Sequence, residues 1–376
     1  MLSIKNISAS LTLLILTACS GQGRYQSFSG YAQGGVWQLK ANMAGVKAGH
    51  AEIQRGIEAI LEDIDTTLSG YNKGSLLSRL NAGDTIVPNA MLCKVYDDAY
   101  ALWQETDGAL DCAAGPLYDL WGFGFKGGEF PDAKQVAGAL AVSGTGRLVP
   151  RMEDALRNGR LQASWLVRTD ESAKTSREKA KAGKGKAMAG VILNFNAIAQ
   201  GYSCDTVASY LDRLGVKDML VDIGEIWCRG LNASGKPWRI GIDRPTDGND
   251  TPGADLDGIW ESAEASSLPA ATGNLTGQGL VTSGNYRKFF IYDGKKYPHT
   301  IDPRTGYPVS GNPLLSATIV APTAELADAY ATYCMVIGLD TAKQFIDSRP
   351  DLEGYLIYDT PDGMAEWRSA GFNLVK

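Results

Sequence analysis

Several residue types and motifs that define common enzyme classes are scarce or missing in this sequence. Only two of the 376 residues are histidine, and no two cysteines have the Cys-x-x-Cys spacing of a zinc site or a thioredoxin-like motif. No Gly-x-x-x-x-Gly-Lys-Ser/Thr loop is present, which argues against a P-loop nucleotidase. The net charge of −6 supplies no basic excess, so we expect no nucleic-acid partner.

What is present is the composition of a folded globular protein. Hydrophobic residues make up 44% and charged residues 21% of the chain, which is long enough for one large domain or two ordinary ones. Five cysteines beyond the N-terminal region are widely scattered, and their simplest interpretation is that of small buried apolar residues. They are Cys93, Cys112, Cys204, Cys228 and Cys334.

The N-terminal region has the features of an export signal. Lys5 precedes a short apolar run at residues 11–16, which is too short to cross a bilayer as a mature helix. The run ends in Leu-Thr-Ala-Cys at residues 16–19, and this ending resembles a bacterial lipoprotein signal, in which the cysteine sulfur receives a diacylglyceryl group. The alternative is a buried first helix with a chance cysteine.

We therefore expect three segments. Residues 1–18 would be a lipoprotein signal peptide, and the mature chain would begin at a lipidated Cys19. Residues 19–32, rich in serine, glycine and glutamine, would form a tether, and residues 33–376 the folded domain. Such a protein would be held by its lipid outside the cytoplasmic membrane, on the periplasmic side of a bacterial cell envelope.

Hydrophobic periodicity predicts an α+β fold with mixed sheets and packed helices. Apolar residues at helical spacing indicate amphipathic helices over 50–68 and 89–105, and further helices are expected at 199–214 and 323–338. The sequence shows no internal repeat and no domain boundary. Strands are expected at 190–195, 219–223, 238–242, 287–292 and 314–321.

Two stretches have the composition of loops. Residues 108–128 are rich in glycine, proline and aromatics, and they contain a Gly-x-Gly-x-x-Gly string at 122–127. A dinucleotide-binding motif needs a strand before this string and a helix after it, so we interpret it as a turn. The basic residues within 168–189 favour a solvated, mobile loop over a binding patch.

The strongest local signal is a rigid polar segment at residues 298–308. Its prolines fix φ and its glycine permits a sharp turn, so its side chains are held in place. The imidazole of His299, the carboxylate of Asp302 and the guanidinium of Arg304 suit proton transfer and phosphate contact. The alternative is a hydrogen-bonded turn with a structural histidine.

A second signal lies in the last predicted helix. Asp328 and Thr332 are four residues apart, which places both oxygens on one helix face. A carboxylate with a hydroxyl suits a hard cation such as Mg²⁺, which keeps few protein ligands and takes substrate phosphate oxygens for the rest. The alternative is a solvent-facing aspartate with a threonine bonded back to its own helix.

Five separated blocks of sequence follow one another over roughly residues 35–345. They are 69–71 with 75–81; 108–111 with 115–117 and 121–124; 194–202 with Asp205; 221–225 with 238–241; and 282–287 with 299–303 and 327–332. No block is decisive alone, but the five in this order resemble the FAD:protein FMN transferases, the ApbE family. The resemblance implies an α+β flavin transferase that moves the FMN half of FAD onto a threonine of a partner protein and releases AMP.

The resemblance also assigns a metal and a base. Mg²⁺ would be held by Asp328, Thr332 and a main-chain carbonyl near Ala197, where it would bridge the FAD pyrophosphate. His299 would activate the acceptor hydroxyl or contact the transferred phosphate, and Asp302 is the alternative base.

The resemblance assigns the FAD pocket as well. Tyr71 would stack on the adenine ring, for which an aromatic face is suited. The other residues expected to line FAD are Ala109, Leu110, Asp111, Asn194, Gln200, Ser283 and Ile301.

The chain departs from the family pattern at three positions. Asn194 stands where the family commonly has an acid, and Gln200 where it has a lysine, so contacts with phosphate or flavin must differ. Only Gly224 precedes the acid of the fourth block, where two glycines are usual.

Two other functions remain open at this point. One is an FAD pyrophosphatase, in which water replaces the threonine and the products are FMN and AMP. The other is a flavin-binding lipoprotein without turnover. The retained Asp328, Thr332 and His299 favour an enzyme over a carrier.

The first testable prediction concerns the anchor. If Cys19 carries the lipid, Cys19→Ser removes the acylated sulfur and leaves the protein soluble or unprocessed. Detergent partitioning and intact mass measure this. A serine variant that still partitions into detergent with the mass of the wild type would contradict the lipoprotein interpretation.

Overall fold

The computed structural model describes most of the chain beyond its N-terminal region. The described residues are 24–124, 130–168, 191–249, 251–263 and 276–375. The predicted signal peptide, Cys19 and the lysine-rich residues 169–189 lie outside them. Within the described ranges, no helix has both the length and the apolar character that crossing a membrane requires.

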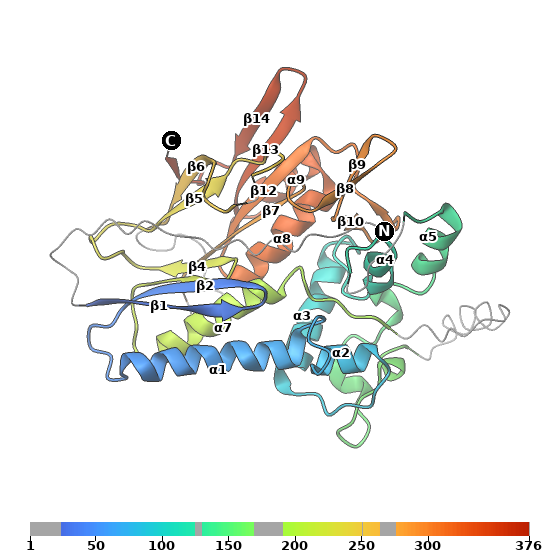
Figure 1. Cartoon of the computed structure of the whole chain (residues 1–376), viewed down its shortest axis with the longest axis horizontal. Helices are drawn as coiled ribbons and strands as arrows, with labels where there is room; N and C mark the ends of the chain where they lie inside the picture. The colour runs from blue at the N-terminus through green and yellow to red at the C-terminus, as the bar shows by residue number, and fades with distance from the viewer. Residues whose placement is uncertain (1–23, 125–129, 169–190, 250, 264–275, 376) are drawn as a thin grey trace.

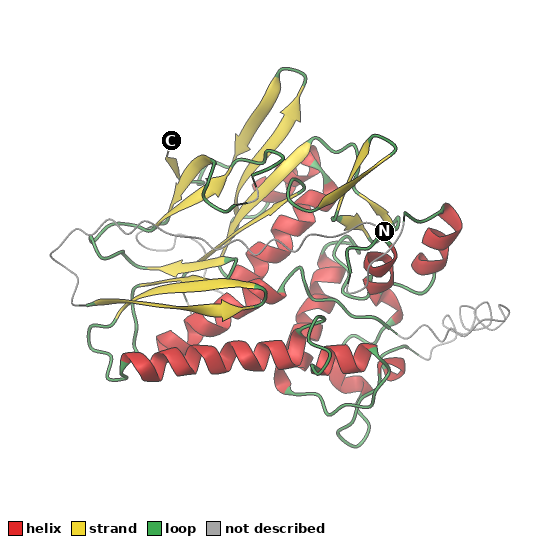
Figure 2. Cartoon of the chain, in the orientation of Figure 1, coloured by secondary structure: helices red, strands yellow, loops and turns green. Residues whose placement is uncertain are grey.

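An eight-stranded sheet forms the body of the protein, and helices α1 (His50–Leu68), α7 (Ala199–Arg213) and α8 (Ala324–Ile337) pack along it (Figure 1, Figure 2). Every pairing between described strands is antiparallel. The predicted α+β class is confirmed. The sheets were expected to be mixed, and the described strand pairs are all antiparallel. In spatial order the strands are β1 (Tyr25–Ala32), β2 (Gly35–Asn42), β3 (Met219–Asp222), β4 (Ile226–Arg229), β7 (Gln278–Gly284), β12 (Leu314–Ala321), β13 (Glu353–Thr360) and β14 (Gly363–Arg368).

The remaining elements are three small sheets and the helices. The small sheets are β15 (Leu374–Val375) with β6 (Leu256–Glu261) and β5 (Arg239–Asp243); β8 (Phe289–Tyr292) with β9 (Lys295–Pro298); and β10 (Ile301–Asp302) with β11 (Tyr307–Pro308). The helices are α1 (His50–Leu68), α2 (Leu76–Asn81), α3 (Ala90–Glu105), α4 (Gly115–Leu120), α5 (Ala133–Leu140), α7 (Ala199–Arg213), α8 (Ala324–Ile337) and α9 (Leu339–Asp347), with 3₁₀ turns η1 (Thr145–Arg147), η2 (Met152–Ala155) and η3 (Ala163–Trp165).

The central strands are apolar on both faces because both faces of the sheet are covered. On β12, Ile319 faces the main core with α7 and α8, whereas Val320 faces a second core built with β5 and β6. On β7, Val281 and Leu280 divide in the same way. Side chains alternate between faces along a strand, so a doubly covered strand reads as a continuous apolar run. This burial explains why 314–321 was predictable to the residue.

The helical predictions are confirmed with small shifts at the ends. The expected helices 50–68, 89–105, 199–214 and 323–338 correspond to α1, α3, α7 and α8. The loop prediction for 108–128 is wrong in its middle, where Pro116 starts the short helix α4 at its first turn. All five cysteines of the folded region are buried, as expected.

The predicted tether over residues 19–32 is wrong from Tyr25 onward. Residues 25–32 form β1, which pairs along its whole length with β2. Phe28 is buried in the main core, and its period-two pattern was hidden among small polar residues. Gln33 and Gly34, both with positive φ, form the tight turn that such a hairpin requires.

The predicted strand over 190–195 is also wrong. Its alternating apolar side chains, Val191, Leu193 and Phe195, are indeed buried. The backbone of Leu193, however, exchanges two 2.8 Å hydrogen bonds with the side-chain amide of Asn81. A side chain thus takes the place of a neighbouring strand, which no periodicity argument detects.

Two glycines let the start of α8 approach its neighbours closely. A Cβ on Gly201 of α7 would lie 2.3 Å from the carbonyl oxygen of Ala324, and a Cβ on Gly279 of β7 would lie 2.4 Å from the nitrogen of the same residue. Both contacts are with backbone, which cannot turn aside. The packing of α8 between α7 and the sheet therefore requires glycine at both positions.

We expect Gly201→Ala to destabilise the fold by about 1–3 kcal/mol, because the added methyl group overpacks a backbone contact. Chemical denaturation followed by circular dichroism measures the free energy of unfolding. The matched control is Gly138→Ala in α5, where nothing lies within 4 Å of the new Cβ. That variant should gain up to about 1 kcal/mol from helix propensity. A stabilised Gly201→Ala variant would contradict the packing argument.

Candidate functional site

Two helix N-termini meet at the predicted site, and each is capped by a carboxylate from the other helix. The Asp205 carboxylate on α7 accepts the N–H groups of Ala324 and Glu325 at the start of α8, at 2.8 and 2.9 Å. The Asp328 carboxylate on α8 accepts the N–H of Gly201 in the first turn of α7, at 3.2 Å. Free N–H groups and the positive end of the helix dipole favour an anion, so this exchange stabilises both helix ends.

The Asp328 carboxyl is buried beside charges of its own sign. Its residue is only 5% exposed, which rules out the solvent-facing alternative. Burial, with Asp205 nearby, raises the pKa of Asp328 to about 7, although the Gly201 N–H opposes the shift. Burial also raises the pKa of Asp205 to about 7, and burial with Asp328 nearby raises the pKa of Glu225. A bound cation would stabilise the charged forms of these carboxyls.

The ligand set around Asp328 fits a hard cation. Thr332 lies one turn further along α8, and its Oγ1 lies 3.3 Å from the Ser283 hydroxyl on β7. Ala197 lies in the turn that leads directly into α7. No group of three or more histidine, cysteine, aspartate or glutamate side chains suited to a metal occurs in the described part of the chain. A cation here would depend on one carboxylate, a hydroxyl, main-chain oxygens and ligand oxygens, which is a set that Mg²⁺ accepts.

Gln200 packs against the turn between β3 and β4. The turn residue Gly224 has a φ of 90°, and a Cβ there would lie 2.7 Å from Gln200 Nε2. The same amide nitrogen lies 3.5 Å from the carbonyl oxygen of Ile223. A glycine is therefore required at this position, both for its φ and for its close fit with Gln200.

Asp111 joins two loops of the predicted FAD pocket. Its carboxylate accepts the Ala113 N–H at 2.8 Å and the hydroxyl and N–H of Thr145 at 2.7 and 3.0 Å. Burial raises the pKa of Asp111. Burial, with Asp111 and Asp302 nearby, also raises the pKa of Tyr118 to about 12. The phenol therefore stays protonated beside two carboxyls that come from segments far apart in the sequence.

The other residues that are predicted to contact FAD differ in how far they are exposed to solvent. Tyr71 is 64% exposed, so its ring is accessible to a ligand. Ala109, Leu110 and Ile301 are buried. Asn194 is half-buried, and its N–H bonds to the segment after Asp111 at 2.7 Å. The structure thus brings blocks two and three of the sequence together.

His299 is held as a neutral imidazole with one nitrogen available. Its Nδ1 lies 3.1 Å from the carbonyl oxygen of Lys288, which only accepts hydrogen bonds, so Nδ1 carries the proton. Burial, followed by the positive charge of Lys288, lowers the pKa of His299 to about 4. Its Nε2 is therefore a proton acceptor at neutral pH.

The Asp302 carboxylate forms an ion pair with Arg304. Its two carboxylate oxygens accept Nε and Nη2 of Arg304, each at 2.9 Å. Arg304 in turn lies against the loop at Gly108, where a Cβ would come within 3.8 Å of its Cγ. Asp302 therefore positions Arg304 beside the loop at Gly108, and His299 is the better proton acceptor of the two.

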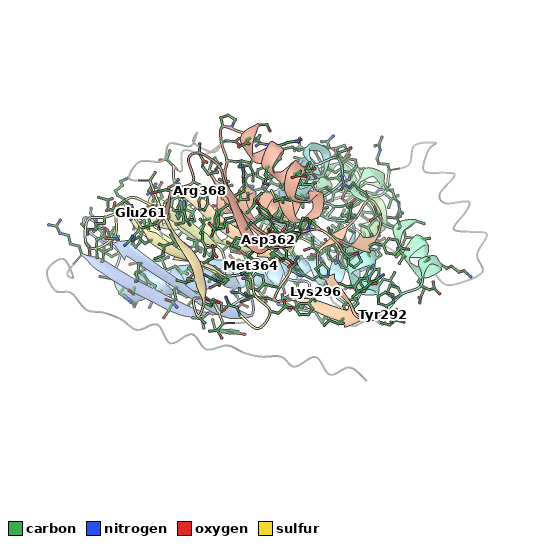
Figure 3. All side chains as sticks on the ribbon, turned by 90° about the horizontal axis from the view of Figure 1, so that it is seen from above. Glu261, Tyr292, Lys296, Asp362, Met364 and Arg368 are labelled. Atoms are coloured by element: carbon green, nitrogen blue, oxygen red, sulfur yellow. The ribbon has the colours of Figure 1, made fainter. Side chains whose placement is uncertain are left out.

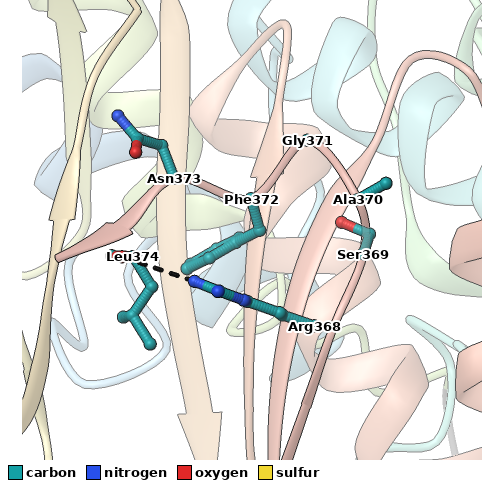
Figure 4. A pocket seen from close by; sticks show the side chains of 7 residues that line it. All are labelled: Arg368, Ser369, Ala370, Gly371, Phe372, Asn373 and Leu374. Atoms are coloured by element: carbon teal, nitrogen blue, oxygen red, sulfur yellow. Dashed lines mark hydrogen bonds between the residues drawn. The ribbon is translucent and has the colours of Figure 1, made fainter. Parts of the chain in front are cut away.

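The sequence assigned no role to three residues of this arrangement, although Asp205 and Glu225 belong to the motif blocks. Asp205, Glu225 and Tyr118 acquire their roles only through the packing of α7, α8, the β3–β4 turn and α4. A surface hollow lined by residues 368–374 contains none of the predicted site residues (Figure 4).

The sequence and the fold were compared with those of known proteins. The family model described as the ApbE family matches residues 34–356. A protein of Haemophilus influenzae named FAD:protein FMN transferase is 32% identical over 375 residues, which cover 98% of this chain and 96% of that protein.

Solved structures agree with this match. The flavin transferase ApbE from Vibrio cholerae superposes with a TM-score of 0.70 at 27% identity, covering 93% of this chain and 98% of that one. The apo form of the Pseudomonas stutzeri flavinyl transferase ApbE gives a TM-score of 0.71 at 27% identity, covering 92% and 95%. Because sequence and fold agree over nearly the whole length, this chain belongs to the ApbE family.

Proposed function

We propose that this protein is an FAD:protein FMN transferase that moves FMN from FAD to a threonine of an acceptor protein and releases AMP. The observation that carries this proposal is the buried Asp328 carboxyl, set among other carboxyls with Thr332 on the same helix face. Such a site suits a cation together with the pyrophosphate of a ligand. The names of the relatives supply the reaction type.

Mg²⁺ is the proposed cation. Asp328, Thr332 and a main-chain carbonyl near Ala197 would hold it. When bound, the ion would supply positive charge that neutralises the pyrophosphate of FAD and the leaving AMP. Asp328 would have two roles, as a ligand of the cation and as a cap of α7, because the same carboxylate accepts the Gly201 N–H in the first turn of that helix.

FAD would lie across the loops that Asp111 and Arg304 hold together. The exposed ring of Tyr71 would stack on adenine. The main chain at residues 109–111 and Ile301, with the side chains of Asn194, Gln200 and Ser283, would line the rest. Gln200 brings no charge, so the cation and Arg304 would supply the positive charge that faces the phosphates.

His299 would accept the proton of the acceptor threonine. A threonine hydroxyl is a weak nucleophile at neutral pH and reacts faster beside a base. The Lys288 carbonyl fixes the tautomer, so that Nε2 is the accepting atom. Asp302 would act indirectly, by positioning Arg304.

We also propose that the protein works outside the cytoplasmic membrane, attached through a lipid on Cys19. The apolar run and the Leu-Thr-Ala-Cys sequence support this location. Its acceptor would then be a flavoprotein exposed to the same compartment.

The function is tested directly by mixing the protein with FAD, Mg²⁺ and a threonine-containing acceptor domain and weighing both products. We expect the acceptor to gain the mass of FMN and AMP to appear in equal amount. Free FMN and AMP without a labelled acceptor would show an FAD pyrophosphatase instead. FAD that binds without any turnover would show a carrier.

We expect Asp328→Asn to lower FMN transfer by at least about 100-fold, because the neutral amide loses the cation but still caps Gly201. EDTA should have the same effect on the wild type. Mg²⁺ with FAD should raise the melting temperature of the wild type and not that of the variant. The control is Asp340→Asn, an exposed residue in the first turn of α9. Full activity in EDTA would refute the metal-dependent mechanism.

We expect His299→Ala to slow FMN transfer by about 10²–10⁴-fold while FAD still binds. His50→Ala is the control, because His50 packs on Phe28 at the start of α1, in none of the motif blocks. Covalent flavin on the acceptor is followed by in-gel fluorescence.

The pH dependence provides a second readout. The pKa of His299 is lowered to about 4, so the neutral base persists as the pH falls through 6.5. Any loss of rate that depends on His299 should therefore occur near pH 4. If the transfer rate instead fell near pH 6.5 in the wild type and this fall were absent in His299→Ala, the pKa of the His299 imidazole would not be lowered.

A further inference from the structure

The hairpin β8–β9 stands apart from the main sheet and leads directly into His299. It forms a two-stranded sheet of its own, with a tight turn at Asp293 and Gly294, both with positive φ. Figure 3 places Tyr292 and Lys296 of this hairpin at the margin of the molecule. A two-stranded hairpin is marginally stable alone, so its position must come from side-chain packing.

One face of the hairpin supplies that packing. Phe290 and Tyr297 lie against Trp121, with ring centroids 6.3 and 6.1 Å away. Tyr292 stacks on Phe130 at 3.8 Å. The hairpin is thus fixed on α4 and on the residue Phe130 beyond it.

The outer edge of β8 has hydrogen-bonding groups without partners among the described residues. The His299 N–H donates to the Lys288 carbonyl at 3.0 Å, which makes these two a hydrogen-bonded pair of the ladder. Such pairs alternate, so the N–H and C=O groups of Phe289 and Ile291 point away from β9. The corresponding edge of β9 includes Pro298, which has no N–H to offer. β8 is therefore the edge that can receive another strand.

The side chains of β8 and of the start of β9 favour an apolar segment with acidic neighbours. Ile291 is 67% exposed. Lys288 and Lys295 are exposed, and neither has an ion-pair partner in the described part of the chain. The two other basic groups of the hairpin are already paired, Arg287 with an aspartate at 2.5 Å and Lys296 with another at 2.5 Å. In a chain of net charge −6, this hairpin is a locally basic surface.

We propose that the acceptor protein docks here, by adding an extended segment as a third strand on the outer edge of β8. The inference rests on the proposed transfer function and names how its partner is recognised. The Lys288 carbonyl that holds the His299 ring points toward β9, so the added strand would run on the other side of β8, about 4.8 Å from the Lys288 backbone. Main-chain hydrogen bonds would supply affinity, and Lys288 and Lys295 would select acidic residues beside the threonine.

The test uses two variants at one position. Ile291→Pro removes an outward N–H that the hairpin does not use, and a proline of this kind is tolerated on a sheet edge. Ile291→Ala keeps that N–H and loses only the side chain. The probe is a fluorescent 15-residue peptide with one central threonine, apolar residues at alternate positions and acidic flanks; a second peptide has lysine flanks. Binding is measured by fluorescence anisotropy in the full-length protein.

We expect the acidic peptide to bind the wild type more tightly than the basic one. Ile291→Pro should weaken binding about tenfold, more than Ile291→Ala does. Lys295→Glu should reverse the preference between peptides, and Met364→Ala, an exposed apolar residue on β14, should change nothing. FAD affinity and melting temperature should stay at wild-type values in every variant, which shows that the hairpin is intact.

Two outcomes separate this inference from the function on which it rests. If the wild type labels its acceptor protein and Ile291→Pro labels it with the same KM, the docking edge is wrong and the transferase stands. If the wild type binds neither peptide, the docking edge is also wrong. If the peptides behave as expected and no acceptor ever gains FMN, the proposed transfer fails while the strand-binding edge remains.

Discussion

The close approach of α7 and α8 is the constraint on which the rest of the structure depends. Gly201 and Gly279 leave room for the backbone of Ala324, and Asp205 and Asp328 hold the two helix starts in exchange. These contacts fix where α8 begins. Because an α-helix rises by about 1.5 Å per residue, its starting point also determines where its later residues lie. Glycine packing and helix capping therefore determine the positions of Asp328 and Thr332 at the proposed metal site.

The same arrangement has an electrostatic cost. Burial raises the pKa of both capping aspartates to about 7, so the folded state holds protons more tightly there than the unfolded chain does. Stability from these groups is present at low pH and falls as the pH rises through 7, where both must be charged. Capping N–H groups offset part of that cost, and a bound cation would offset more. A site whose buried carboxylates lack compensating positive charge is well suited to a ligand that carries positive charge.

The loops proposed to bind FAD are assembled by a second set of polar contacts. Asp111 fastens the loop at residues 109–113 to Thr145, and the Asp302–Arg304 pair brings the segment after β10 against Gly108. Tyr118 lies between these two carboxyls. The aromatic packing of β8–β9 on Trp121 extends this unit to the hairpin and so positions His299. His299, the loops proposed to bind flavin and the proposed acceptor edge consequently belong to one packed substructure.

The sequence alone determined the elements whose burial follows a simple period. The α1 helix and β12 are examples, because one buries a helical stripe and the other both faces of a strand. The motif blocks likewise led to the prediction that Asp328, Thr332 and His299 are site residues. Only the tertiary structure decided that Asn81 replaces a strand beside Leu193, that residues 25–32 complete the sheet, and that Asp205 and Glu225 surround Asp328. Those outcomes depend on partners distant in sequence, and local periodicity carries no information about a partner's identity.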